Sequence, residues 1–169
     1  NRNMQFNRDY VAYKLLDPKL KYISGHFPFD MVLYKVFENK FDYFTILRDP
    51  VQKWLSNYYY RTNRTAIING GKVDHWKINS EIEKYLHSER GHFHGYDYSK
   101  YYGGIREKYD YNSKEAIQNA KENLSKFKII GFLEDLDSLK KDFYQHYKFE
   151  LNFAHKKKSR DEKDNKITN

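Results

Sequence analysis

The segment TILRDPVQKWLSNYYY, Thr45 to Tyr60, decides the fold, because one continuous run predicts a strand, a turn and a helix. Its apolar start belongs to FDYFTILR, Phe41 to Arg48, a near-continuous apolar run that predicts a strand buried on both faces. Asp49 is a favourable N-cap and Pro50 is favourable at the first helical position, so a helix is expected to begin here. The inward stripe of this helix is expected to be Val51, Leu55 and Tyr58.

Two other short runs predict strands, and three amphipathic runs predict helices. The strands are expected at LKYISGHF, Leu20 to Phe27, and at KIIGF, Lys128 to Phe132. The helices are expected over Phe29–Phe37, over Ser113–Phe127 with Ser113 as its cap, and over Glu134–Phe149. Strands that alternate with helices indicate an α/β protein with a mainly parallel sheet flanked by helices, in a single domain over residues 1–169.

Two stretches depart from this alternation. Residues 61–111 are rich in Gly, Asn, His and Tyr, and they predict a surface excursion with one helix around Ser80–His87. Long irregular segments in compact domains are usually functional, so this excursion is expected to face a ligand. Residues 155–169 are polar and charge-dense, and they predict a loop or a frayed tail.

The composition constrains the partners of the protein. The formal net charge of +8 favours anionic partners such as nucleotides, nucleic acid or acidic polysaccharide, although a solvated basic surface explains the same charge. The absence of Cys excludes disulfides, thiol nucleophiles and cysteine metal sites. No apolar run reaches the roughly 20 residues of a membrane helix, so no membrane segment is expected in this chain.

The motifs give little support to a metal site or to a kinase-type nucleotide site. His92 and His94 in GHFHG stand two residues apart, but no third or fourth ligand follows at a recognisable interval, so no metal is expected. The sequence also lacks the Gly-x-x-x-x-Gly-Lys-Ser/Thr pattern of a kinase-like nucleotide enzyme.

A polar row on the helix after Pro50 suggests an anion site. Arg48 falls at the carboxyl end of the expected strand, where open α/β sheets bind ligands. Lys53, Ser56 and Tyr60 follow at helical spacing, apart from the apolar stripe. A guanidinium fork and a hydroxyl together can hold a phosphate. The alternative is that Arg48 pairs with a nearby carboxylate and Ser56 only lies on the helix surface.

The run RDPVQKWLSNYYY resembles a segment of sulfotransferases, most closely the carbohydrate O-sulfotransferases of the heparan sulfate 2-O and 6-O type. Their pattern is roughly R-x-P-x-x-R-x-x-S-x-Y-Y, of which this chain keeps Arg48, Pro50, Ser56, Tyr58 and Tyr59. Lys53 stands where the family often has Arg, so it keeps the charge and loses the bidentate fork. The resemblance implies a P-loop-like sulfotransferase fold in which Arg48 and Ser56 hold the 3′-phosphate of 3′-phosphoadenosine 5′-phosphosulfate and Lys53 also binds this nucleotide.

Two further motifs extend the resemblance over about Lys21 to Leu139, patchily between Arg61 and Tyr111. YISGHFPFD, Tyr22 to Asp30, looks like the family strand that ends in Gly-His, which implies that His26 is the catalytic base. A lone His is otherwise more often a surface or core residue. IIGFLEDLDSL, Ile129 to Leu139, is similar to the late strand with Gly-Phe-x-Glu.

The resemblance implies the remaining partners. A sulfo group would pass from the nucleotide donor, a co-substrate, to a hydroxyl of a neutral or acidic glycan, with no nucleic acid and no metal. The expected acceptor contacts are Arg61, Arg64, His94, Tyr98 and Lys100, each of which a solvated loop residue also explains. In HKKKSRDEK, Lys158 and Ser159 are expected to close over the nucleotide, unless this run is only a solvated basic tail.

One departure from the family concerns the donor loop. The family's first strand leads into Pro-Lys-x-Gly-x-Ser/Thr, and nothing before Lys21 resembles it. We therefore expect the domain to be incomplete at its N-terminal side; the alternative is that the protein has lost donor activation. The location stays open between a Golgi lumen, with an anchor outside this chain, and a bacterial cytoplasm. The alternative function is a non-catalytic basic module that binds nucleic acid or a sulfated glycan, with steep salt dependence.

Overall fold

Two parallel strands form the centre of the computed structural model, which describes residues 2–68, 70, 75–104 and 110–153. β1 (Phe44–Leu47) pairs with β2 (Ile129–Phe132), and the register runs from Phe44 opposite Ile129 to Leu47 opposite Phe132. Helices flank this small sheet, so the expectation of an α/β protein with a parallel sheet is confirmed in this broad form.

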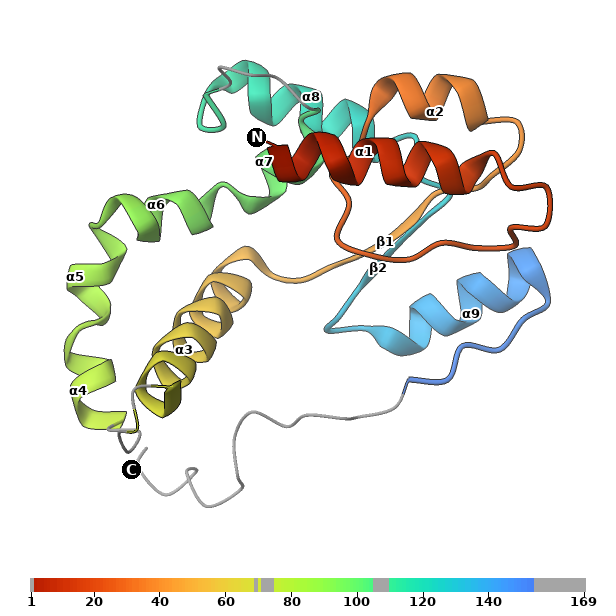
Figure 1. The fold of residues 1–169 in the computed structure, drawn as a ribbon. Helices are drawn as coiled ribbons and strands as arrows, with labels where there is room; N and C mark the ends of the chain where they lie inside the picture. The colour runs from red at the N-terminus through yellow and green to blue at the C-terminus, as the bar shows by residue number, and fades with distance from the viewer. Residues whose placement is uncertain (1, 69, 71–74, 105–109, 154–169) are drawn as a thin grey trace.

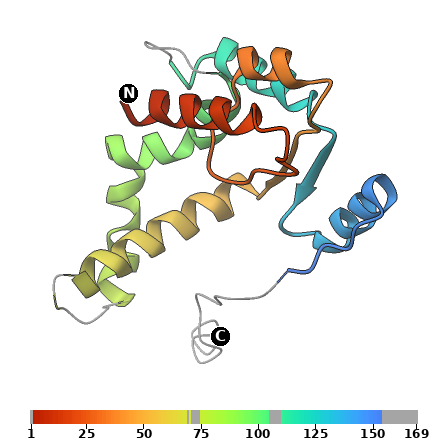
Figure 2. The same cartoon turned by 45° about the vertical axis from the view of Figure 1, so that its right-hand side comes forward.

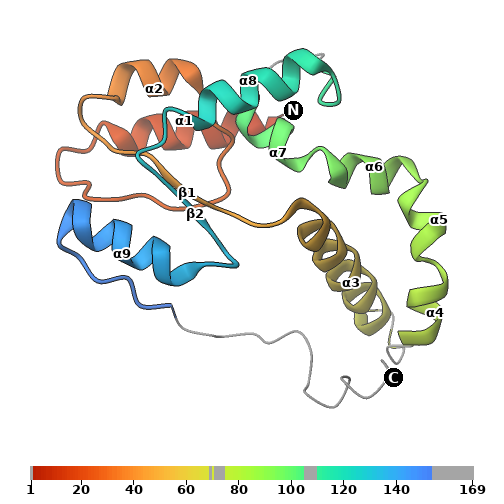
Figure 3. The same cartoon turned by 180° about the vertical axis from the view of Figure 1, so that it is seen from behind.

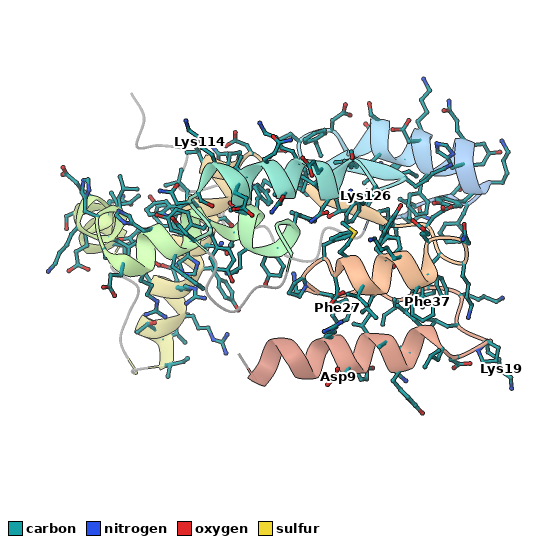
Figure 4. All side chains as sticks on the ribbon, turned by 90° about the horizontal axis from the view of Figure 1, so that it is seen from above. Asp9, Lys19, Phe27, Phe37, Lys114 and Lys126 are labelled. Atoms are coloured by element: carbon teal, nitrogen blue, oxygen red, sulfur yellow. The ribbon has the colours of Figure 1, made fainter. Side chains whose placement is uncertain are left out.

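The helices form layers on the two sides of the strands. Figure 1 and Figure 3 show α1 (Arg2–Leu15), α2 (Met31–Phe37) and α8 (Lys114–Leu124) on one side, and α9 (Leu136–Tyr147) on the other. Seen from above in Figure 4, α1 lies beside α2, and α8 lies beyond α2. The described helices include none with both the length and the apolar character needed to cross a membrane.

The α9 side of the sheet carries a compact apolar core. Leu139 and Phe143 of α9 pack against Ile129 of β2, with Leu136, Tyr147, Leu151 and Phe153 around them. Gly131 permits this close approach, because a Cβ there would lie 2.6 Å from Leu139 Cδ1. The hydroxyl of Tyr147 donates to Asp42 at 3.0 Å, and burial together with this bond raises the pKa of Tyr147 to about 12.

Aromatic rings fill the opposite side. Phe29 lies within ring-contact distance of Tyr34, Tyr43 and Phe127, and its own side chain is buried. The N–H of Phe29 donates to the carbonyl of Tyr101 at 2.6 Å, so the connection before α2 is tied to the distant chain around residue 101. These contacts hold α2, the segment after α8 and the residue before β1 together.

The strand β1 is less buried than its sequence predicts. Phe44 and Ile46 are 42% and 39% exposed, so the expectation of a strand buried on both faces is wrong. The reason is the placement of α9, which packs its core residues mainly over β2 and reaches β1 through the ring contact of Phe143 with Phe44, with centroids 5.0 Å apart, so that both Phe44 and Ile46 stay partly open to solvent. An apolar run alone does not tell how many neighbours a strand has.

The helix after β1 begins as predicted. α3 (Pro50–Ile68) opens at Pro50, and the carboxylate of Asp49 accepts the N–H of Gln52 at 2.9 Å. The predicted inward stripe is right for Tyr58, which is 2% exposed, and wrong for Val51, which is 63% exposed. Val51 lies in the first turn of α3. Leu55 is partly buried.

Where the structure describes it, the stretch 61–111 is largely helical rather than irregular, and α5 confirms the helix predicted around Ser80–His87. α3 continues to Ile68, and α4 (His75–Ser80), α5 (Ile82–Leu86), α6 (Glu89–Gly95) and α7 (Asp97–Tyr102) follow. Figure 2 shows these short helices running back beside α3. They are held by contacts to α3: Trp54 Nε1 donates to the carbonyl of Gly91 at 2.8 Å, and the Tyr58 ring packs on Tyr85 at 4.8 Å. Tertiary packing thus overrides weak local helix propensity.

The segment Leu20–Phe27 is not a strand, contrary to expectation. It is an irregular connection between α1 and α2, and Figure 4 places Phe27 close to the start of α2. The β-branched and aromatic residues that suggested a strand do not pack as one, and Tyr22 is 78% exposed. Pro18 and Pro28, at either end, also restrict regular pairing.

The remaining predicted elements are confirmed, with shorter bounds. α2, α8, β2 and α9 lie within the predicted ranges, and Ser113 Oγ accepts the N–H of Ala116 at 3.0 Å as the predicted cap. The helix α1 was not anticipated, and it is held by Arg8, whose Nε lies 2.8 Å from Asp30. Residues 155–169, predicted to be a loop or tail, lie outside the described residues.

Candidate functional site

The candidate site is centred on the turn from β1 to α3. Because the strands are parallel, Arg48 after β1 and Glu134 after β2 come to the same edge of the sheet. Arg48 is followed directly by Asp49, the cap of α3, so the positive end of a 19-residue helix faces the same region. Burial of Tyr58 and packing of Trp54 on α6 hold this helix in place.

Tyr98 holds the main chain of Arg48 at this turn. The Arg48 N–H donates to the Tyr98 hydroxyl at 2.8 Å, and this hydroxyl donates to the Arg48 carbonyl at 2.5 Å. Burial raises the pKa of Tyr98 above its ordinary value, although the bond to Arg48 opposes the shift. The hydroxyl therefore stays protonated and able to donate at neutral pH.

The side chain of Arg48 has a carboxylate neighbour. Its Nε lies 3.9 Å from Glu134 Oε1, longer than a hydrogen bond, and about a third of the Arg48 side chain and half of the Glu134 side chain are exposed. The same Glu134 oxygen accepts the N–H of Asp49 at 3.1 Å. The carboxylate partner that the ion-pair alternative requires is present. Exposed pairs of this kind contribute at most about 1 kcal/mol, so an incoming anion can displace it.

Lys53 belongs to a charged cluster around the buried Asp97. Its ammonium lies 3.1 Å from Asp97 Oδ2, and Lys100 binds Oδ1 at 2.9 Å. Asn57 donates to Oδ2 at 3.4 Å. Burial by itself would raise the pKa of Asp97, but the bonds and charges of Lys100 and Lys53 outweigh it, so the pKa is lowered. The carboxylate is therefore ionised and neutralises part of the charge of both lysines.

His94 is buried rather than exposed to an acceptor. It is 8% exposed, its ring stacks near Tyr85 with centroids 6.4 Å apart, and its Nε2 has no hydrogen-bond partner among the described residues. Burial, and then the charge of Arg61, lower the pKa of His94, so the imidazole is neutral at pH 7. The expectation that His94 lies on a solvent-facing loop is wrong, because α6 turns it inward.

The other expected acceptor contacts divide into two groups. Tyr98 and Lys100 lie in the Asp97 cluster, where their polar groups already have protein partners. Arg61 and Arg64 are exposed on the later turns of α3, and Arg64 reaches the hydroxyl of Tyr60 at 3.4 Å. The two arginines therefore remain available to a ligand in a way that Tyr98 and Lys100 do not.

The last two predicted site residues are Ser56, on α3, and His26, before α2. Ser56 is partly buried, and it lies one turn after Lys53 on the same side of α3. His26 is exposed on the connection before α2. It precedes Phe29 by three residues, so their Cα atoms are at most about 11 Å apart. Since Phe29 is bonded to Tyr101, His26 is tethered close to α7.

Two predicted contacts cannot be placed. Lys158 and Ser159, expected to close over the nucleotide, lie outside the described residues. Within the described part of the chain, no group of three or more His, Asp or Glu side chains gathers in a metal-ligand arrangement.

Sequence reasoning missed one carboxylate of the site, Asp97, and did not anticipate the contact made by the other, Glu134. Asp97 lies at the centre of the cluster, and its only sequence signal is the spacing of three to Lys100, which is common on helix surfaces. Glu134 was recognised within Gly-Phe-x-Glu, but its contact with the Arg48 turn depends on the strand pairing.

Comparison of the chain with protein-family models, with curated proteins and with solved structures gives no significant match in any of the three. The assignment of a function therefore rests on the motifs and on the geometry of the site.

Proposed function

We propose that the protein is a sulfotransferase that uses 3′-phosphoadenosine 5′-phosphosulfate and a carbohydrate acceptor, within a P-loop-like sulfotransferase fold. The observation that carries the proposal is the position of Arg48. It lies at the carboxyl end of a parallel strand, immediately before the capped N-terminus of α3, and its main chain is held by Tyr98.

This position suits the 3′-phosphate of the donor. A doubly charged phosphate would gain two charge-assisted bonds from the Arg48 guanidinium, a further donor from Ser56 and the favourable end of the α3 dipole. Only the weak pair with Glu134 would have to separate. In this proposal Lys53 acts mainly through its long-range charge, because its ammonium is bound to Asp97.

The proposed reaction uses His26 as the base. The acceptor hydroxyl oxygen attacks the sulfur of the donor, the bond between this sulfur and the bridging phosphate oxygen breaks, and His26 takes the hydroxyl proton. The leaving group is 3′-phosphoadenosine 5′-phosphate. The exposure of His26 and its tether to α7 through Phe29 support this role. His26→Ala should lower turnover about 100-fold or more while nucleotide affinity is kept, whereas His92→Ala, another exposed histidine, should change neither.

Nucleotide specificity is the test of the proposed phosphate site. Calorimetric titration of the full-length protein should show that 3′-phosphoadenosine 5′-phosphate binds at least about tenfold more tightly than adenosine 5′-phosphate, which lacks the 3′-phosphate. Equal affinities would contradict the proposal.

The alternative of a basic module for anionic polymers is favoured by the net charge of +8. Such a module would bind heparin and nucleic acid with affinities that fall steeply with salt, and it would not distinguish the two nucleotides.

A further inference from the structure

Tyr98 makes a contact that an acceptor-binding residue would not need. Its single hydroxyl accepts the N–H of Arg48 at 2.8 Å and donates to the carbonyl of the same residue at 2.5 Å. The two residues are 50 positions apart, so this bond joins α7 to the end of β1. Tyr98 is thus bound to the backbone of the residue that the proposed function places on the phosphate.

The bond acts on the direction of the Arg48 side chain. The N–H and the carbonyl of Arg48 lie in the turn between β1 and α3. Neither group belongs to the bonds within α3 or to the ladder with β2, in which the Leu133 N–H donates to the carbonyl of Leu47, the residue before Arg48. When both groups are fixed by one hydroxyl, the two peptide planes at Arg48 are fixed with them. The Cα–Cβ direction of Arg48 then follows.

The ring of Tyr98 acts on the second cation of the site. The Lys53 ammonium lies 4.3 Å from the ring centroid, within the range of a cation–π contact, and 3.1 Å from the adjacent Asp97. One short helix therefore positions both the strand-end arginine and the lysine on the first turns of α3.

We propose that Tyr98 is a positioning residue for the Arg48 turn, and that it couples α7 to the anion site. This inference rests on the proposed function only in taking a nucleotide as the anion. It assigns Tyr98 a role different from contact with the acceptor.

Tyr102 provides a matched control on the same helix. Its hydroxyl makes a 2.6 Å bond to Thr45 Oγ1, in the middle of β1, and its ring packs near that of Tyr98. Tyr98→Phe and Tyr102→Phe each remove one hydroxyl that joins α7 to the β1 segment and keep the ring. Only Tyr98→Phe releases the main chain of Arg48.

The experiment measures amide hydrogen exchange of residues 48–53 and calorimetric affinity for 3′-phosphoadenosine 5′-phosphate in the full-length wild type and both variants. We expect Tyr98→Phe to increase the exchange rate of the Arg48 amide at least tenfold and to weaken the nucleotide about tenfold. Tyr102→Phe should leave both close to wild type.

The two readouts separate the inference from the proposed function. If the Arg48 amide exchanges equally in the two variants, or is already fast in the wild type, the inference is wrong whatever the protein binds. If the wild type binds no nucleotide but the Arg48 amide responds to Tyr98→Phe alone, the positioning role stands and the proposed function fails. Unequal exchange with equal nucleotide affinity would overturn the coupling to the anion site.

Discussion

Glu134 and Arg48 meet across the carboxyl ends of the two paired strands, with Glu134 Oε1 3.9 Å from Arg48 Nε. The carboxylate is placed where it both orders the turn, through the N–H of Asp49, and opposes an anion that approaches Arg48. Glu134 therefore holds the Arg48 guanidinium in place and lowers the affinity of the site for an anion.

Glu134→Gln tests this relationship. Glutamine keeps an oxygen that can accept the Asp49 N–H and removes the negative charge, so affinity for 3′-phosphoadenosine 5′-phosphate should rise about two- to fivefold, in line with a weak exposed pair. Calorimetry measures the effect. Glu122→Gln, on the exposed surface of α8, serves as the charge-matched control and should change nothing. Weaker binding in Glu134→Gln would mean that the carboxylate supports the site rather than competing with the ligand.

Asp97→Asn should destabilise the fold, because Lys53 and Lys100 would both lose their partner in a buried region. We expect a loss of about 1–3 kcal/mol in the free energy of unfolding, measured by denaturant titration. Asp137→Asn is the matched control: its pair with Lys140 has the same spacing but is exposed, so it should cost less than about 1 kcal/mol. Equal losses in the two variants would show that the buried Asp97 pairs stabilise the fold no more than the exposed Asp137 pair does.

The stability of the protein should depend on pH through His94. Its pKa in the folded state is lowered, first by burial and then by the charge of Arg61, so the unfolded chain binds a proton more readily. The stabilisation by neutral His94 is fully present above the unfolded pKa of about 6.5 and is lost as the pH falls toward the lowered folded pKa. His94→Gln should flatten the unfolding free energy over this interval, whereas exposed His92→Gln should leave its slope unchanged. An identical slope in wild type and His94→Gln would contradict the assignment.

Gly131→Ala tests how α9 is held on β2. The new Cβ would lie 2.6 Å from Leu139 Cδ1 and 2.7 Å from Cδ2 of the same residue, which is buried, so the contact cannot relax into solvent. We expect a loss of about 1–3 kcal/mol in the free energy of unfolding. At Gly95 a Cβ would meet nothing within 4 Å, so Gly95→Ala should be neutral or slightly stabilising. A neutral Gly131→Ala would mean that α9 sits farther from the sheet.

Local signals in the sequence were sufficient for part of this fold. The Asp49 cap, Pro50 at the start of α3 and the Ser113 cap are decided by neighbouring residues, and each was predicted correctly. Of the helices between residues 75 and 102, only the one around Ser80–His87 was predicted, and α5 confirms it. The others were not predicted, because their stability comes from contacts with α3 such as that of Trp54 with Gly91.

The prediction of the site from the sequence was limited in the same way. Arg48 and Lys53 could be selected from their place around a strand-to-helix turn. Their partners Glu134, Asp97 and Tyr98 approach from distant positions, and only the packing of β2 and α7 brings them there. The inward orientation of His94 likewise depends on the packing of α6, which spacing along the chain does not encode.

The most direct measurement for the central proposal is the affinity of the full-length protein for 3′-phosphoadenosine 5′-phosphate in the wild type, in Arg48→Ala and in Lys128→Ala. Lys128 is an exposed cation at the opposite end of β2, so its removal makes the same change in net charge. The proposal predicts that Arg48→Ala weakens the nucleotide about 10- to 100-fold while Lys128→Ala binds like the wild type. A wild-type protein that binds no nucleotide, or an equal loss in both variants, would contradict it.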